Sequence, residues 1–406
     1  MSSQSSYRVA IFTLAIGALL SPAFAASNGK VIYNFTGQND GGGPATQITF
    51  APNGDAYGTT VTGGDFGCGT VFQLAPIGGD WQETTLYSFT CGADGKNPYG
   101  GVTSDPVGNL YGTTVAGGNG GACAGDGCGT VYALTKSGNS WSEAVIYNFT
   151  GGNDGFGPGG RVVFDNEGNL FGTTPDGGQY SMGVVYELSL TGNGSWQQTV
   201  IHAFTGGNDG GVGSLGSLLY VEGEFYGVTE LGGAYGAGTV FSLSRKSDTW
   251  TFATVHQFQG QPHAAFPYGG LITDGNAQFF GTTYFGGAYG QGTVFLLEVA
   301  GGKVRERVLH SFTGGNDGSN PTSTPTFDNA GNLYVTTSSG GSGGCQCGTI
   351  FKLSFTKGEI KGTALHSFQG PDGAFPNYGL TFNGNLYGST PVGGVHNQGV
   401  IFTFTP

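Results

Sequence analysis

Six aspartates recur at one place along the chain and are the side chains best suited to hold a cation. Each precedes a glycine in a short polar loop: Asp40, Asp94, Asp154, Asp209, Asp317 and Asp372. A ring of such carboxylates could bind Ca²⁺, which prefers oxygen ligands, or a cationic ligand. Aspartate before glycine is also a turn residue that hydrogen-bonds its own backbone. The pattern therefore leaves a weak Ca²⁺ prediction beside a structural interpretation, and no other cofactor is predicted.

Candidates for catalysis are the polar residues that stand outside every recurring position, because a reaction needs one site rather than seven. They are Asp176, Glu230, Arg161, His263 and His396. Asp176 and Glu230 fall at adjacent offsets in neighbouring copies of a repeat and could form a loose acid–base arrangement. Solvation of the surface explains these residues equally well. No nucleophile elbow, P-loop or zinc motif is present, so an enzyme is less favoured than a protein without catalytic activity.

Aromatic residues in the glycine-rich loops are candidates for ligand binding. The chosen ones are Tyr180, Tyr235, Phe285 and Tyr289. Exposed rings of this kind can stack on sugar rings, because both present a flat apolar face. The alternative is that they fill gaps between loops.

Six cysteines are the third chemical signal, and their positions suggest pairs. Cys68, Cys128 and Cys347 each directly precede a recurring strand. Cys91 follows the end of the strand that should pair with the one after Cys68. The remaining two, Cys123 and Cys345, lie in two lengthened loops next to Cys128 and Cys347. We therefore predict the disulfides Cys68–Cys91, Cys123–Cys128 and Cys345–Cys347, with a metal site as the weaker alternative because no histidine has ligand spacing with them.

The elements that position these residues form seven copies of one unit. The most regular stretch is Gly108-Asn109-Leu110-Tyr111-Gly112-Thr113-Thr114, followed by a Gly-Gly loop and a run such as Gly-Thr-Val-Phe. A phenylalanine closes each unit, and neighbouring units are 54 to 60 residues apart: Phe35, Phe89, Phe149, Phe204, Phe258, Phe312 and Phe368. Two residues before it stands a tyrosine or a histidine, which indicates a packing position with a polar tip. No segment has the 3.6-residue apolar period of a helix.

Four short strands per unit, seven units and no helices predict an all-β, seven-bladed β-propeller with four antiparallel strands per blade. The last unit stops after its third strand, and the chain begins with an unpaired fourth strand over residues 30–35. Pairing these two would complete the seventh blade and remove an exposed edge. A β-solenoid is the competing architecture, but its coils are usually shorter than these units. In such a blade both long glycine-rich loops emerge on one face, here called the loop face, and the tight turns emerge on the opposite turn face.

Composition and targeting signals place the protein outside the cytoplasm. Residues 1–25 are predicted to be a signal peptide, with Arg8, an apolar run over residues 9–20 and Ala23-Phe24-Ala25 before the cleavage point. Residues 26–406 then form one propeller domain, secreted or periplasmic, with no later membrane-spanning segment or anchor. The formal charge is −13, and −14 without Arg8, which makes nucleic acid and anionic membranes poor partners. Glycine, at 83 of 406 residues, recurs at fixed turn offsets rather than in a low-complexity tract.

The repeat resembles the bacterial family of secreted "choice-of-anchor" proteins built from GloVer tandem repeats. The resemblance rests on Gly-Asn-Leu-Tyr-Gly-Thr-Thr, the Gly-Gly loop and Gly-Thr-Val-Phe-x-Leu, and covers residues 31–404. It implies export but no assigned activity, and this chain lacks the C-terminal anchor that such proteins often carry. The Asp-x-x-Gly-Asn-Leu-Tyr hairpin is similar to that of NHL-type propellers, which are mostly interaction platforms.

Taken together, these features predict an exported, monomeric binding or interaction module. Its expected partner is a polysaccharide or another cell-envelope component held on the loop face. The alternative is a glycan-processing or lactone-type hydrolase with its site at the mouth of the central channel.

Overall fold

The computed structural model describes residues 28–119, 121, 123, 125–138, 140–213, 216–247, 249–356 and 358–406. The predicted signal peptide lies outside these residues. Every regular element within them is a β-strand. Consequently this part of the chain contains no helix that could cross a membrane.

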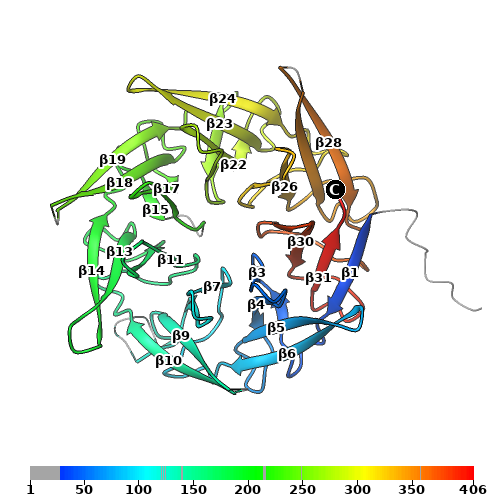
Figure 1. The fold of residues 1–406 in the computed structure, drawn as a ribbon. Coiled ribbons are helices and arrows are strands. Elements are labelled where there is room, and N and C mark those ends of the chain that lie inside the picture. The colour runs from blue at the N-terminus through cyan, green and yellow to red at the C-terminus, as the bar shows by residue number, and fades with distance from the viewer. Residues whose placement is uncertain are drawn as a thin grey trace, which may run out of the picture.

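Seven antiparallel sheets surround a central axis in chain order, which confirms the predicted propeller (Figure 1). Blade 1 contains β2 (Gly42–Pro44), β3 (Thr49–Phe50), β4 (Ala56–Thr62), β5 (Thr70–Ile77) and β6 (Asp80–Ser88). Blade 2 contains β7 (Val102–Ser104), β8 (Leu110–Thr114), β9 (Thr130–Ser137) and β10 (Ser140–Asn148). Blade 3 contains β11 (Val163–Phe164), β12 (Leu170–Thr174), β13 (Val184–Leu190) and β14 (Trp196–Ala203).

The remaining blades repeat this plan. Blade 4 contains β15 (Gly211–Gly213), β16 (Leu219–Val221), β17 (Glu224–Leu231), β18 (Thr239–Lys246) and β19 (Thr249–Gln257). Blade 5 contains β20 (Ala264–Pro267), β21 (Ile272–Thr273), β22 (Gln278–Gly286), β23 (Thr293–Ala300) and β24 (Lys303–Ser311). Blade 6 contains β25 (Thr326–Phe327), β26 (Leu333–Thr337), β27 (Thr349–Thr356) and β28 (Glu359–Ser367). In blades 1, 4 and 5 two short strands share the innermost place, both pairing with the second full strand.

The seventh blade is closed by the two ends of the described chain. It contains β29 (Thr381–Asn383), β30 (Asn385–Thr390), β31 (Val400–Phe404) and β1 (Gly29–Asn34). β1 pairs antiparallel with β31, with Gly29 opposite Phe404 and Asn34 opposite Val400. The predicted closure is therefore present, and the sheet order β1-β31-β30-β29 leaves no broken blade.

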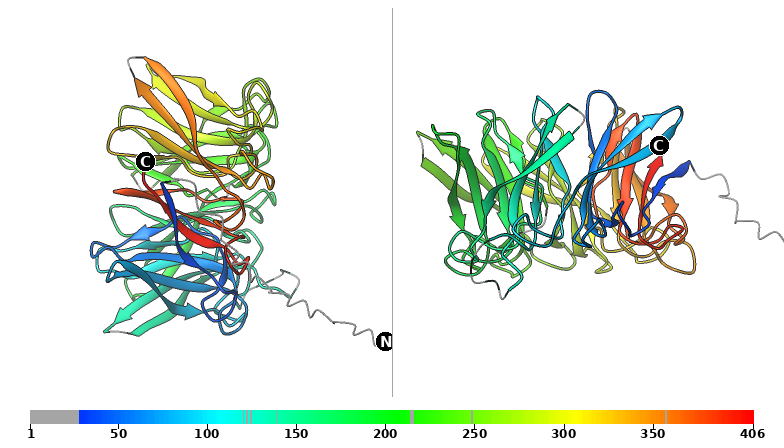
Figure 2. Two further views of the ribbon diagram at one scale, coloured as in Figure 1. Left: turned by 90° about the vertical axis from the view of Figure 1, so that its right-hand side faces the viewer. Right: turned by 90° about the horizontal axis from the view of Figure 1, so that it is seen from below.

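Burial along a blade follows distance from the axis. The second strand of blade 3, β12, is buried at all five positions, because neighbouring blades cover both of its faces. The outermost strand of the same blade, β14, alternates between partly buried and exposed residues over its first half. Figure 2 shows the ring edge-on, with the long loops gathered on one side and the tight turns on the other.

The recurring Gly-Asn-Leu-Tyr-Gly-Thr-Thr stretch is structural throughout. Gly108 has φ +92° in the hairpin turn, a conformation that favours glycine. A β-carbon on Gly112 would collide with the Tyr132 ring of the neighbouring strand. The Thr113 hydroxyl donates to the Gly160 carbonyl of blade 3 (3.1 Å), and the Thr114 hydroxyl contacts the Thr130 hydroxyl (2.8 Å). The motif thus joins strands and blades, and function must lie where the repeats differ.

Candidate functional site at the channel mouth

The six recurring aspartates anchor the loops between blades. In blade 2, Asp94 accepts hydrogen bonds from the Tyr87 hydroxyl (2.9 Å) and from the Thr90 backbone N–H (2.7 Å) and hydroxyl (2.5 Å). Asp40, Asp154, Asp209, Asp317 and Asp372 make corresponding bonds to a tyrosine or histidine and to the backbone. The polar tip of the Tyr/His position therefore meets the loop aspartate. Among the described residues no three His, Cys, Asp or Glu side chains gather to hold a metal ion.

The fifth repeat has no loop aspartate, and a glutamate from the outermost strand of blade 5 takes its place. Glu306 on β24 contacts His256 Nε2 (2.8 Å) and accepts a bond from the Ala264 backbone N–H (3.0 Å). His263 occupies the loop in place of the usual sequence and is exposed. Its side chain is not part of this arrangement.

The three disulfides have the predicted pairing: Cys68–Cys91, Cys123–Cys128 and Cys345–Cys347. No free cysteine is present in the described part of the chain. Each bond lies on the loop face and fastens a second-to-third-strand loop or the loop that follows the fourth strand. They thus hold the loops that surround the channel mouth.

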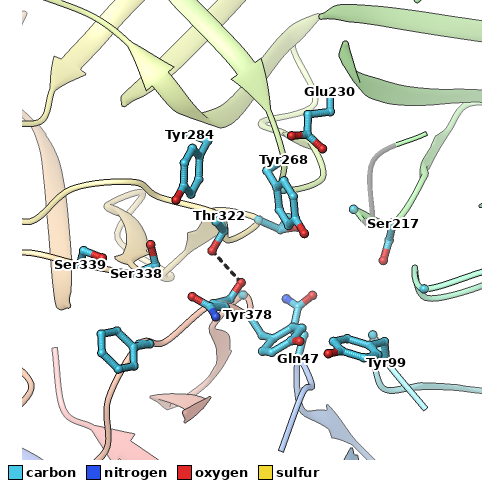
Figure 3. Close-up of a pocket in the computed structure, with 18 of the residues that line it drawn as sticks. Gln47, Tyr99, Ser217, Glu230, Tyr268, Tyr284, Thr322, Ser338, Ser339 and Tyr378 are labelled. Atoms are coloured by element: carbon cyan, nitrogen blue, oxygen red, sulfur yellow. Dashed lines mark hydrogen bonds between the residues drawn. The ribbon is translucent and has the colours of Figure 1, made fainter. Parts of the chain in front are cut away.

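A cavity of about 610 Å³ opens at the axis on the loop face. Its wall combines aromatic rings with neutral polar groups, as Figure 3 shows. The aromatic residues come from three blades: Tyr99, Tyr268, Tyr284, Phe285, Phe375 and Tyr378. The polar side chains are Gln47, Ser217, Glu230, Thr322, Thr324, Ser338, Ser339 and Asn377.

Local sequence explains why these side chains reach the axis. Tyr99 and Tyr268 directly follow the prolines that end the loop before the innermost strand, and Tyr378 lies two residues after the corresponding Pro376. Pro267 packs against Gly238 of the preceding blade, where a β-carbon on the glycine would collide with it. This contact fixes where Tyr268 enters the channel. Glu230 and Tyr284 occupy one position, directly after the Thr-Thr or Val-Thr pair of the second strand, in neighbouring blades.

Burial shifts the titration of the cavity groups toward their neutral forms. Burial raises the pKa of Glu230 above its usual value. The pKa of Tyr268 is raised by burial and then by the negative charge of Glu230, and burial raises the pKa of Tyr378 well above its usual value. Tyr268 and Tyr378 therefore remain neutral hydrogen-bond donors at physiological pH.

One buried polar atom of a wall residue lacks a partner among the described residues. The Asn377 side-chain oxygen is buried and has no hydrogen-bond partner among the described residues. The backbone carbonyl of Asn377 accepts a hydrogen bond from the Thr322 hydroxyl (3.0 Å), and this bond joins the two loops (Figure 3). A buried unpaired acceptor costs free energy, and a ligand hydroxyl would recover it only if the Asn377 side chain turned toward the cavity.

Arg161 reaches across the innermost strands of three blades rather than into the cavity wall. Its guanidinium donates to the backbone carbonyls of Gln47 in blade 1 and Gly100 in blade 2. Burial lowers its pKa to about 10, so the group stays charged at neutral pH. The hydrogen bonds make Arg161 a clasp between blades, behind the wall that Gln47 and Gly100 form.

The other candidate residues are separated. Glu230 lines the cavity, whereas Asp176 is exposed and, like His263 and His396, is not part of the wall. Adjacent offsets on a strand point to opposite sides, which explains why Asp176 and Glu230 do not meet. Phe285 lines the cavity. Tyr180, Tyr235 and Tyr289 are 49%, 61% and 61% exposed at loop tips outside it.

Reasoning from the sequence missed the combination of Tyr99, Tyr268, Tyr284 and Tyr378. A signal was present, because positions that directly follow the loop prolines hold a small or polar residue in several other blades, such as Ala45, Gly159 and Thr322. Aligning these positions around the axis would have shown Tyr99 and Tyr268 together, and aligning the position directly after the second strand would have added Tyr284 and Glu230.

Comparisons with known structures agree on the fold. A candidate 6-phosphogluconolactonase from Bacteroides uniformis matches with a TM-score of 0.54 at 12% identity, over 83% of this chain and 88% of that one. A hypothetical selenium-binding protein from Sulfolobus tokodaii matches with a TM-score of 0.52 at 8% identity, over 81% and 82%. At such identities the likeness concerns the fold alone.

Sequence comparison identifies the repeat. No curated protein matches the chain. The family described as the Gloeobacter/Verrucomicrobia repeat matches residues 120–326 and 216–406, together more than half of the chain. The chain therefore belongs to the Gloeobacter/Verrucomicrobia repeat family.

Proposed function

We propose that the protein is a binding module that holds a carbohydrate at the channel mouth. The observation that carries this proposal is the wall of four tyrosines and two phenylalanines interleaved with neutral amides and hydroxyls. A sugar ring has an apolar face of C–H groups and a rim of hydroxyls, so it fits aromatic stacking beside neutral donors and acceptors. The buried, unpaired Asn377 side-chain oxygen would accept from one of those hydroxyls if the side chain turned toward the cavity.

The setting of this site suits a polysaccharide or another cell-envelope component. Three disulfides are typical of proteins in an oxidising compartment, and a secreted or periplasmic location follows from the predicted signal peptide. We expect a monomer, and we expect binding to be independent of Ca²⁺ because the recurring aspartates already accept hydrogen bonds from protein groups. Chelation with EDTA tests the second expectation.

A glycan-array screen followed by calorimetric titration of the best ligand tests the proposal. Removing a stacking surface, with Tyr268→Ala or Tyr378→Ala, should weaken binding at least tenfold, about 1.4 kcal/mol. Ile77→Ser is the matched control, because Ile77 is exposed on the opposite face. Equal binding by the tyrosine variants and the control would contradict the assignment of the site.

A hydrolase remains the alternative, with Glu230 as its acid. Glycoside hydrolysis usually needs two carboxylates, and Glu230 is the one carboxylate among the described residues of the wall. Glu230 has a raised pKa, as a general acid requires. Release of reducing ends from a bound glycan, abolished by Glu230→Gln, would favour the hydrolase; binding without turnover favours the module.

A further inference from the structure

A second cavity lies where the repeat normally places a tryptophan. In four blades the fourth strand begins near a Trp whose indole packs on the central aromatic ring of the preceding blade. The ring pairs are Trp81–Tyr387 (5.9 Å), Trp141–Tyr57 (6.1 Å), Trp196–Tyr111 (6.4 Å) and Trp250–Phe171 (5.5 Å). These indoles fill the space between neighbouring blades near the turn face.

Three blades lack this tryptophan: in blade 7 its position is Ser27, which lies outside the described residues, and of the other two blades one compensates. Val304 replaces it in blade 5, where the second strand carries Phe279 at a position that is leucine in blades 2, 3, 6 and 7. The Phe279 ring packs on the central Tyr226 of blade 4 with a centroid distance of 4.5 Å. Val304 packs against the same hydrophobic cluster. A larger neighbour thus replaces the missing indole.

Blade 6 has neither the tryptophan nor a phenylalanine at the position of Phe279, and the ring nearest the tryptophan position is Phe355 on β27, whose centroid lies 6.3 Å from that of Phe280. Ile360 stands in the tryptophan position, and the residue that corresponds to Phe279 is Leu333. A cavity of about 760 Å³ lies between blades 5 and 6, with Phe280, Phe327, Phe355 and Ile360 in its wall. Phe280 is the central ring that has no indole partner here. The volume of the cavity falls in the range of about 300–1,000 Å³ that is typical of small-molecule sites.

The wall also determines which ring would fit. The Trp250 indole N–H donates to Glu187 in the preceding blade (3.2 Å). The residue at the position of Glu187 in blade 5 is Leu296, which is buried and lines the cavity. A hydrocarbon ring without an N–H group therefore matches this wall better than an indole, because it leaves no donor unpaired.

The rim of the cavity is acidic. Its described charged residues are four carboxylates and one guanidinium: Asp274, Glu298, Asp328, Glu359 and Arg307. Their formal sum is −4 + 1 = −3. Aromatic rings in the wall also attract a cation, as within blade 2, where Lys136 lies 5.5 Å from the ring centroid of its cross-strand neighbour Trp141. Both features favour a positively charged ligand.

We propose that the cavity between blades 5 and 6 binds a small aromatic amine, with its ring on Phe280 and its ammonium group at the acidic rim. This site is on the turn face and is independent of the carbohydrate site. The ring would lie on Phe280 beside Phe355, next to the space that tryptophan fills at four other interfaces. The charge of the rim selects a cation over an anion of the same shape.

Calorimetric titration with naphthylethylamine and naphthylacetate tests the proposal, because the two probes share a ring of indole size and differ in charge. We expect saturable one-to-one binding of the amine, at least about tenfold tighter than the acetate. Absence of saturable amine binding would overturn the proposal, as would equal affinity for the two probes.

The repeat itself supplies the decisive variant. Ile360→Trp restores the residue found in four other blades and should fill the cavity, abolish amine binding and raise the unfolding temperature. Ile360→Val is the control and should keep the amine affinity and the unfolding temperature near the native values. If Ile360→Trp fails to fold, Glu298→Gln with Glu359→Gln should weaken the amine while leaving the acetate no weaker than before. Amine binding that survives both the filled cavity and the reduced charge would refute the site.

Discussion

Two interfaces between blades differ in which acidic side chain accepts hydrogen bonds: the glutamate of the fourth strand at one interface and the loop aspartate at the other. Between blades 4 and 5, Glu306 reaches His256 and the Ala264 backbone, because the loop there has no aspartate. Between blades 1 and 2 the corresponding glutamate is Glu143, but Asp94 already accepts the Tyr87 hydroxyl. The Glu143 Oε1 atom is buried without a hydrogen-bond partner among the described residues.

The difference teaches that the position along the repeat does not fix the role of a side chain. Burial and then the nearby Asp94 raise the pKa of Glu143 to about 7, so this glutamate is held partly protonated. Glu83 in blade 1 has its pKa raised to about 7 by burial, with Asp40 adding to the effect. Blade 3 carries Gln198 at the same place, which is neutral at every pH. Whether the loop across the interface carries an aspartate decides whether the fourth-strand glutamate is the main hydrogen-bond acceptor there or a second carboxylate beside that aspartate.

The largest effect should follow removal of the glutamate that has partners. Glu306→Ala leaves His256 and the Ala264 N–H without an acceptor and should lower the free energy of unfolding by about 3 kcal/mol. Urea unfolding followed by fluorescence measures it. Glu143→Ala is the matched control, and we expect a smaller loss because its Oε1 atom is unpaired and Asp94 also accepts the Tyr87 hydroxyl with which Glu143 interacts. Equal losses would remove the contrast between the two interfaces.

A smaller effect should follow removal of the loop acid. Asp94→Ala deletes the acceptor of three hydrogen bonds and should cost about 2 kcal/mol. Glu143 then becomes the carboxylate nearest Tyr87, as Glu306 is at His256, and its pKa should fall because one cause of its rise is gone. NMR titration of the Glu143 side chain measures this shift. An unchanged pKa would mean that the charge of Asp94 does not contribute to it.

The smallest effect is a dependence of stability on pH. The folded-state pKa of Glu83 and Glu143 exceeds the unfolded value, so folding takes up protons, and the stability is lost as pH rises from about 4.5 to about 7. Each group should contribute less than about 1 kcal/mol, because solvent screens both. Glu83→Gln with Glu143→Gln, which copies blade 3, should flatten the urea midpoint between pH 5 and pH 8. A slope equal to that of the native protein would contradict this origin.

The scaffold was predictable because its signals are local and repeated. The offset between the Tyr-Gly-Thr-Thr strand and the closing phenylalanine indicates four strands per unit. Antiparallel pairing then places Cys68 beside Cys91 and β1 beside β31. The channel-mouth site was only partly predictable: Glu230 and Phe285 were identified, but Asp176, His263 and His396 lie outside the wall. Those three belong to loops whose direction relative to the axis no local pattern records.

The sequence by itself determined the blade count, the closure and the disulfides, since each depends on spacing along one chain. Tertiary structure decided what meets across blades. It brought Tyr99, Tyr268 and Tyr378 to one mouth and turned Arg161 toward the backbones of blades 1 and 2. It also placed Phe279 on Tyr226 at one interface and Phe355 on Phe280 at the next. Contacts between blades depend on the size and direction of side chains from units more than 50 residues apart. No periodicity within a single unit contains that information.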